Sequence, residues 1–265
     1  MGRYLLAALA ALILFGAGCS RSKIDLTSDL AGRWPLGTNT SGVLAPIQAS
    51  LTGGVSLVST TLGPAYQFDG QTGRVVVGDA PEFQFRAGQN FSILAWIAPE
   101  QAETSFGVMS IVEKRKIGGI TSALGYSLHL EYGKLACQLT TAPGFHFKVS
   151  DLASPKRLLA SWQARKQLQS ANRFISQQPD LRDGKLHQVA LTLDRDSSTG
   201  GKLYVDGKLV LTFDPTKVRG SLVNSEPLMI GTHPDPTLQC AFKGKIGGVR
   251  VYRRALSPAE INAAK

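Results

Sequence analysis

The acidic residues of this sequence are scattered, and their spacing bears on hydrolytic chemistry. Retaining hydrolysis of a glycosidic bond needs two carboxyl groups about 5–5.5 Å apart, one as acid and one as nucleophile. A Glu-x-Asp-x-Glu string would put such groups on one face of a strand, and the sequence contains none. Asp194 and Asp196 run into Ser-Ser-Thr-Gly-Gly, which indicates a solvated turn, while Glu82, Glu113 and Glu131 stand apart. We therefore expect no catalytic residue and no enzyme.

The histidines do not indicate a metal site. His129, His146 and His233 lack the spacing of zinc ligands. His187 lies in a predicted strand, where we expect a structural role rather than proton transfer. The histidines therefore predict no cofactor.

Residues 1–19 have the order of an export signal. Arg3 precedes an apolar run, Leu5 to Phe15, that is shorter than the about 20 residues of a membrane-spanning helix. The small residues before Cys19 resemble the lipobox of bacterial lipoproteins, whose cysteine is acylated. That motif usually has Leu where this chain has Gly16. We expect residues 1–18 to be removed, Cys19 to be lipidated, and residues 19–29 to form a lipid-anchored tether.

The predicted anchor implies a location in the cell envelope. Ser20, directly after the cysteine, resembles the sorting pattern of outer-membrane lipoproteins. Two or more acyl chains would hold the protein stably on a membrane. The alternative is a plain secretory signal that happens to contain a cysteine, which would make the protein secreted or periplasmic.

Net charge and the remaining cysteines constrain the partners and the redox state. The chain has 29 basic against 19 acidic residues, a net charge of +10 that favours anionic partners. Because an exported protein rarely meets nucleic acid, we do not expect nucleic acid among them. Export would also place Cys137 and Cys240 where a disulfide can form. They could equally be two buried thiols, and both alternatives stay open.

The rest of the chain is mostly short strands separated by turns. Phe91 to Ile97 is apolar and rich in strand formers, as in a central sandwich strand. The strands 202–205 and 208–213 flank Asp206 and Gly207, a pair typical of a type I′ hairpin turn. Gly133 predicts a second hairpin between 126–132 and 134–139. Without regular alternation of strands and helices, this pattern favours an all-β sandwich.

Two helices are predicted within this β-rich chain. Ser257, Pro258 and Glu260 form a capping-box pattern that begins a short C-terminal helix, residues 258–264. A helix at about 155–177 would be an insertion. Its basic and aromatic residues are a candidate surface for an anionic ligand: Lys156, Arg157, Trp162, Arg165, Lys166 and Arg173. Alternatively, Trp162 packs this helix onto the sandwich.

Five segments in order resemble the laminin-G-like domains of the concanavalin A-like lectin/glucanase superfamily. They are Gly32–Leu36; Phe68-Asp-Gly70 with Gly73–Val77; Phe91–Ile97; Gly184–Ala190 continuing through Gly201–Lys208; and Phe242–Ile261. The resemblance implies an antiparallel two-sheet jelly roll over residues 30–265, with the inserted helix and the C-terminal helix.

Departures from the family pattern bear on its core and its calcium sites. Leu186 replaces a usual Trp, which we interpret as a core substitution. Gly247 and Gly248 stand where an acidic pair often follows Ile, which weakens a calcium site. Asp69 matches a family position and is a weak calcium candidate, although Asp before Gly favours a turn. Arg250 is interpreted as an outward residue of an edge strand.

These observations favour an envelope-anchored, non-catalytic binding module that recognises carbohydrate or a cell-surface protein. The ligand rests on analogy, because fold alone does not identify one. One alternative is a glycan-cleaving enzyme with an atypical site, which predicts facing carboxylates in a groove. The other is a structural envelope protein whose basic inserted helix docks on anionic lipid or protein, with salt-dependent association.

Overall fold

The computed structural model describes residues 24–34, 49–102, 104, 107–118, 122–141, 172–235 and 237–265. The predicted signal peptide and Cys19 lie outside these residues. So do five members of the predicted basic surface, Lys156, Arg157, Trp162, Arg165 and Lys166.

Eight strands of the described chain form the first sheet, sheet A. In chain order they are β1 (Leu30–Trp34), β3 (Val55–Thr60), β4 (Gly63–Asp69), β6 (Phe91–Pro99), β11 (His187–Leu193), β12 (Gly201–Val205), β13 (Lys208–Phe213) and β15 (Lys243–Tyr252). Their spatial order is β13-β12-β11-β6-β15-β4-β3, and β1 also pairs with β15. All of these pairings are antiparallel.

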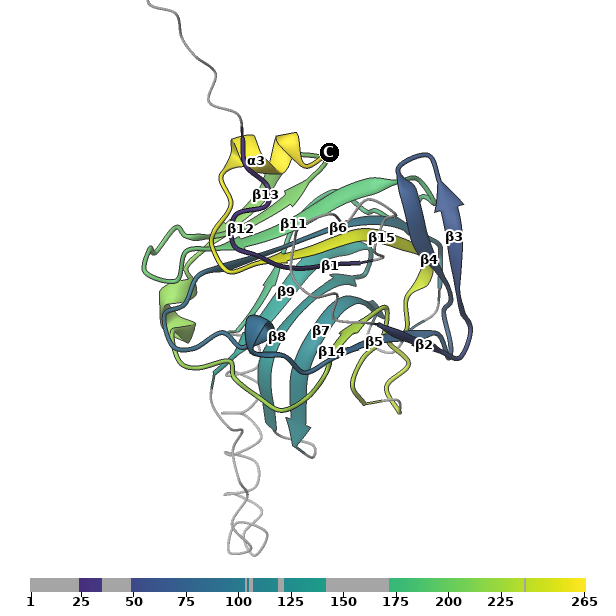
Figure 1. Ribbon diagram of the computed structural model, residues 1–265, viewed down its shortest axis with the longest axis horizontal. Helices are drawn as coiled ribbons and strands as arrows, with labels where there is room; N and C mark the ends of the chain where they lie inside the picture. The colour runs from purple at the N-terminus through teal and green to yellow at the C-terminus, as the bar shows by residue number, and fades with distance from the viewer. Residues whose placement is uncertain are drawn as a thin grey trace, which may run out of the picture.

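Seven described strands form the second sheet, sheet B. They are β2 (Ser50–Thr52), β5 (Arg74–Gly78), β7 (Val108–Gly118), β8 (Ser122–Glu131), β9 (Lys134–Thr140), β10 (Arg173–Ile175) and β14 (Leu228–Ile230). The spatial order is β10-β9-β8-β7-β14-β5-β2, again antiparallel. Short 3₁₀ turns occupy Pro81–Phe83 and Pro215–Val218. Figure 1 shows the two sheets as stacked layers, which confirms the predicted sandwich.

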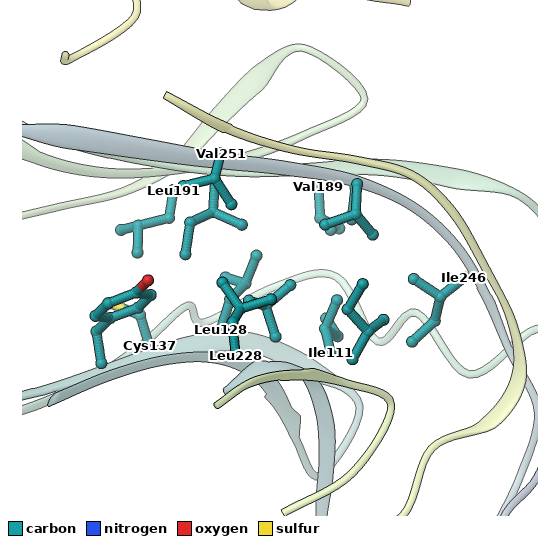
Figure 2. Close-up of a cluster of buried hydrophobic side chains, with 14 of the residues drawn as sticks. Ile111, Leu128, Cys137, Val189, Leu191, Leu228, Ile246 and Val251 are labelled. Atoms are coloured by element: carbon teal, nitrogen blue, oxygen red, sulfur yellow. The ribbon is translucent and has the colours of Figure 1, made fainter. Parts of the chain in front are cut away.

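One apolar core fills the space between the sheets. Val189, Leu191 and Val251 point inward from sheet A, and Leu128 and Leu228 face them from sheet B (Figure 2). All five side chains are fully buried. Removing apolar area from water stabilises the fold by about 25 cal/mol per Å², and this is the main contribution that holds the two layers together. The alternating apolar positions of each strand therefore determine which face points inward.

Two hairpins form at the turns that the sequence predicts. Asp206 and Gly207 both have positive φ, as a type I′ turn between β12 and β13 requires. Tyr132 and Gly133 also have positive φ at the turn between β8 and β9.

The C-terminal helix, α3 (Pro258–Ala263), begins with the predicted capping box. The Ser257 side chain accepts a hydrogen bond from the Glu260 backbone N–H, and the Glu260 carboxylate accepts one from the Ser257 N–H. The helix lies on the outer side of sheet A (Figure 1). There Ile261 packs with Leu94, Ala190 and Tyr252.

The predicted helix at 155–177 is wrong at its C-terminal end. Residues 173–175 form the strand β10, which pairs with β9. The Phe174 ring stacks on Phe213, with 3.9 Å between the ring centroids. Pairing with β9 satisfies the backbone, and the half-buried Phe174 packs against the core, so tertiary contacts override the local helix preference.

The two cysteines are buried thiols and do not form the disulfide that was one of the alternatives. Cys137 points into the core from β9 (Figure 2). Cys240 lies near the charges of Glu113 and Arg115, on the outer side of sheet B. A disulfide needs Cβ atoms about 3.5–4.5 Å apart, and the sheet stands between these two side chains.

The last part of the predicted tether is held by the sandwich. The Tyr252 hydroxyl donates to the Leu26 carbonyl (3.1 Å), and the Arg253 N–H donates to the Asp29 carbonyl (2.8 Å). Leu26 also packs against the cluster beneath α3. Among the described residues, no helix has the length and apolar character needed to cross a membrane.

Candidate functional site

The outer face of sheet B carries a row of polar side chains. Ser127, His129 and Glu131 alternate along β8 and therefore share a face, and Glu113 lies directly opposite Ser127 on β7. All four side chains are almost completely buried. Glu113 and Glu131 looked isolated in the sequence. The pairing of β7 with β8 brings both residues to one face of sheet B. The alternation of apolar residues within each strand indicates that each of them points outward.

Glu113 is fully engaged by its neighbours. The Arg115 Nε and Nη2 donate to its two carboxylate oxygens at 2.7 and 2.9 Å. The Ser110 hydroxyl adds a third hydrogen bond at 3.1 Å. A bidentate guanidinium holds a carboxylate firmly. Glu113 is therefore a structural partner of Arg115, and it is not positioned as a catalytic nucleophile or a general acid.

Glu131 and His129 form the second part of this cluster. Burial raises the pKa of Glu131, against the opposing charge of Arg173, whose Nη2 lies 3.1 Å from Oε1. Burial also lowers the pKa of His129 to about 3, with help from Arg115 and Arg173, so the ring is neutral at pH 7. Its Nδ1 lies 3.1 Å from the Ser127 hydroxyl and its Nε2 4.0 Å from Glu131.

The cluster resembles a serine–histidine–carboxylate arrangement without an accessible nucleophile. Ser127 is 0% exposed and the His129–Glu131 distance is too long for a hydrogen bond. The segment after β14 also lies on this face, where the Ser110 N–H donates to the Cys240 carbonyl (3.0 Å). In the described chain, no group of three His, Cys, Asp or Glu is arranged to hold a metal. The outer face of sheet B therefore presents a buried polar network.

The outer face of sheet A contains an open hollow at a change of strand partners. Residues 243–247 of β15 pair with β4, whereas residues 249–252 pair with β1. The pairing of β15 with β6 shifts register between Gly247 and Arg250. Beside this bulge is a hollow of about 100 Å³, which we call the seam hollow. It is lined by Arg33, Thr60, Leu62, Pro64, Ala65, Trp96, Leu186, Lys245, Gly247, Gly248, Arg250, Ala264 and Lys265.

Two glycines make the seam hollow possible. Gly248 has φ +55°, a conformation that L side chains adopt at a cost of about 1–2 kcal/mol. A Cβ there would lie 3.1 Å from Cδ1 of Trp96, and a Cβ on Gly247 would lie 2.9 Å from the Ala65 Cβ. The bulge therefore needs glycine, and the absence of side chains leaves space beside Trp96.

An aromatic ring and four cations give the seam hollow its chemistry. Trp96 projects from β6 to the outer face, because its neighbours Ala95 and Ile97 point into the core. Arg33 and Arg250 are cross-strand partners on β1 and β15. Lys245 lies before the bulge, and Lys265 is the fourth cation of the lining. Burial lowers the pKa of Arg250, and the charge of Arg33 contributes to that shift. Among the described residues, no acidic side chain lines the hollow.

Sequence reasoning misjudged several of these positions. Leu186 lines the seam hollow rather than the core, and Arg250 lies on a central strand rather than an edge strand. The sequence of residues 91–97 favours an apolar central strand, and the outward position of Trp96 in the alternation of this strand is the one signal that identifies it. Arg33 carries no such signal, because its partner is more than 200 residues away.

The remaining predicted site residues have structural partners. Asp69 Oδ1 accepts hydrogen bonds from the backbone N–H groups of Gln71, Thr72 and Gly73, and Oδ2 accepts one from the Thr72 hydroxyl. Burial opposes these bonds, but they lower the pKa of Asp69 to about 2. Asp69 therefore acts as a turn residue. Arg173, the described member of the predicted basic surface, is paired with Glu131.

Comparison of the sequence with family models gives one match. The family is described as the concanavalin A-like lectin/glucanases superfamily, and its model matches residues 69–262. No curated protein sequence matches the chain closely enough to count as a relative.

Solved structures share the fold at low sequence identity. The binding domain of Paraclostridial Mosquitocidal Protein 1 has a TM-score of 0.61 at 13% identity, covering 89% of this chain and 51% of that one. Domain 4 of an extracellular GH43 arabinanase from Geobacillus stearothermophilus, in complex with arabinotriose, has a TM-score of 0.54 at 14% identity, covering 90% and 98%. The botulinum neurotoxin serotype D ligand binding domain, in complex with N-acetylneuraminic acid, has a TM-score of 0.53 at 14% identity. The match covers 82% of this chain and 45% of that one.

The coverage and the sequence identity of these matches determine which conclusions they support. This chain spans about half the length of the two toxin domains and nearly all of the arabinanase domain. At 13–14% identity the likeness concerns the fold. The family match covers most of the chain and agrees with the two antiparallel sheets. The chain belongs to the concanavalin A-like lectin/glucanases superfamily.

Proposed function

We propose that this chain is a non-catalytic binding module that recognises carbohydrate at the seam hollow. The observation that carries the proposal is the outward Trp96 in an open hollow, beside two glycines. Small-ligand sites are typically concave, with an aromatic surface and a few polar groups that fix orientation. An indole offers the apolar face of a sugar ring a flat surface at little conformational cost.

The proposal that the chain does not catalyse a reaction is supported by the state of the carboxylates on sheet B. The carboxylate of Glu113 is held by Arg115, and Glu131 lies in a cluster whose side chains are buried. A glycosidase needs two carboxyl groups that can reach one glycosidic bond. The fold neighbours in complex with arabinotriose and N-acetylneuraminic acid add support for a carbohydrate ligand, by analogy of fold.

The test is glycan binding by the purified full chain and a Trp96→Ala variant. We expect the variant to lose about tenfold or more in affinity, the scale of a central aromatic contact. Trp96→Phe should retain part of the binding. Tyr132→Ala, which removes an exposed aromatic ring at the β8–β9 turn, is the matched control and should bind normally. Equal binding by Trp96→Ala would overturn this site. No binding to any glycan would favour a protein partner instead.

A second measurement separates binding from cleavage. The chain should bind its glycan without releasing new reducing ends over long incubation. Release that disappears in Glu131→Gln would reverse the assignment and make the sheet B cluster an active site.

The proposal includes anchorage in the cell envelope, most specifically as an outer-membrane lipoprotein. It is supported by the lipobox-like residues before Cys19 and by Ser20 after it. A Cys19→Ser variant should move from the membrane fraction to the soluble fraction and lose incorporation of labelled fatty acid. Unchanged membrane association and no label in the original chain would instead indicate a secreted or periplasmic protein.

A further inference from the structure

We propose that the seam hollow selects an acidic sugar, and that Arg33 and Arg250 bind the carboxylate of a uronic acid residue. The inference rests on the proposed carbohydrate function and adds the ligand's chemical class. The two arginines are direct cross-strand partners, and they line the hollow together with Trp96.

The first argument is the arrangement of like charges. Directly opposite side chains on antiparallel strands have Cβ atoms about 4.5–5.5 Å apart, where like charges repel. In the described part of the chain, neither Arg33 nor Arg250 forms an ion pair with an acidic residue. The Arg250 Nη1 donates to the Ala264 carbonyl (3.2 Å), which orients its guanidinium without neutralising it. A bound anion would remove the repulsion.

The second argument is that, among the described residues that line the hollow, no acidic side chain competes for the anion. Its basic lining residues are Arg33, Lys245, Arg250 and Lys265. This differs from two other arginines of the described chain: Arg254 lies 2.7 Å from Glu260, and Arg219 pairs with Asp196. The basic side chains of the seam hollow therefore lack the acidic partners that Arg254 and Arg219 have within the described chain.

The third argument concerns the type of anion. Two guanidinium groups match the planar carboxylate, which Arg binds through paired N–H donors. Trp96 offers a flat apolar surface for the ring that carries the carboxylate. A phosphate group alone has no flat apolar face to place on an indole. The combination of aromatic ring and arginine pair therefore fits a uronic acid better than the phosphate of a lipid headgroup.

The experiment uses the full chain and matched ligands that differ only in charge. Oligouronides of galacturonic, glucuronic and mannuronic acid are each compared with their methyl esters, which keep the ring and remove the charge. We expect at least one acid form to bind tenfold or more tightly than its ester, with the difference shrinking at high salt. Arg33→Gln and Arg250→Gln should each reduce that ratio severalfold. Arg253→Gln, which removes an exposed arginine outside the hollow, should leave it unchanged.

The outcomes separate this inference from the proposed function. If acid and ester bind equally and Trp96→Ala weakens both, the carbohydrate function stands and the acidic selectivity is wrong. If no oligosaccharide binds in any form, both are wrong. Vesicles that contain anionic phospholipid are tested in parallel. Binding to these vesicles that depends on Arg33 and Arg250, without binding to oligouronides, would replace the sugar with a lipid headgroup.

Discussion

The outer faces of the two sheets differ in whether their charged side chains have partners of opposite charge. On sheet B, Glu113 and Arg115 are buried and bonded to each other, and Glu131 pairs with Arg173. On sheet A, Arg33 and Arg250 face each other across two strands without an acidic partner, beside an open hollow. The outer face of sheet B satisfies these charges within the chain, whereas the seam hollow on sheet A leaves its two arginines without acidic partners among the described residues.

The difference follows from burial. A charge that is removed from water needs a partner inside the protein, because the desolvation cost is otherwise several kcal/mol. Arg33 is exposed and Arg250 half-buried, so water can hydrate both until a ligand arrives. Residues that destabilise a fold slightly while serving a ligand are a recurrent feature of binding sites. The contrast therefore indicates that the acidic residues of sheet B support the fold, and it is the basis for proposing that Arg33 and Arg250 serve recognition.

The largest expected effect would come from breaking the buried pair on sheet B. Arg115→Met leaves Glu113 buried with Ser110 as its remaining hydrogen-bond donor, and should lower the free energy of unfolding by about 3–5 kcal/mol. Arg33→Met on sheet A is the control and should change it by less than about 0.5 kcal/mol. Denaturant unfolding monitored by fluorescence measures both. Similar effects for the two variants would erase the contrast between the faces.

One histidine on each sheet gives the stability of the protein a different dependence on pH. His129 on sheet B has a lowered pKa, about 3, so unfolding allows it to take up a proton. Its contribution is complete above the unfolded pKa, about 6.5, and is lost as pH falls below that value. For His187 on sheet A, burial opposes the charge, but Asp206 (2.9 Å) and Asp183 (3.1 Å) raise the pKa. Its contribution is complete below about pH 6.5 and is lost as pH rises through the folded pKa.

Unfolding of His129→Gln and His187→Asn across pH 4–9 tests these opposite signs. We expect His129→Gln to reduce the loss of stability in acid. His187→Asn should lose stability mainly below about pH 6.5 and approach the original chain at higher pH. NMR titration of the two imidazoles gives an independent measurement. A common pKa near 6.5 for both rings would contradict the prediction.

An intermediate effect is expected at the bulge. Gly248→Ala should destabilise the chain by about 1–2 kcal/mol, because Ala disfavours φ +55°. Its Cβ should also press on Trp96 and weaken glycan binding. Gly184→Ala is the matched control, since Gly184 has φ +73° with nothing within 4 Å of the added Cβ. Calorimetry should show a similar loss for both variants, but only Gly248→Ala should bind more weakly. Normal binding by Gly248→Ala would argue against the seam hollow.

The smallest effect should be a gain in stability. Arg33→Gln removes one of two like charges on opposed strands, and should raise the free energy of unfolding by about 0.2–0.5 kcal/mol at low salt. The gain should fade at high salt, because an exposed charge is screened. Thermal unfolding at two salt concentrations measures it. A loss of stability would mean that Arg33 contributes to the fold, contrary to the comparison of the two faces.

The sequence by itself determined the local structure of this protein. Alternating apolar residues set the inward face of each strand, Asp206 and Gly207 set a hairpin, and Ser257 to Glu260 set the start of α3. These features depend on residues within a few positions of one another, so their physical causes are visible in a short window. The order of family-like segments then predicted the sandwich as a whole.

Only the tertiary structure decided which distant residues meet. Glu113 and Glu131 share a face because β7 pairs with β8, and Arg33 meets Arg250 because the first described strand pairs with the last. Trp96 joins them because β15 bulges at Gly247 and Gly248 and changes partners there. Strand register fixes these neighbours, and register is set by the combined packing of both sheets rather than by any one segment.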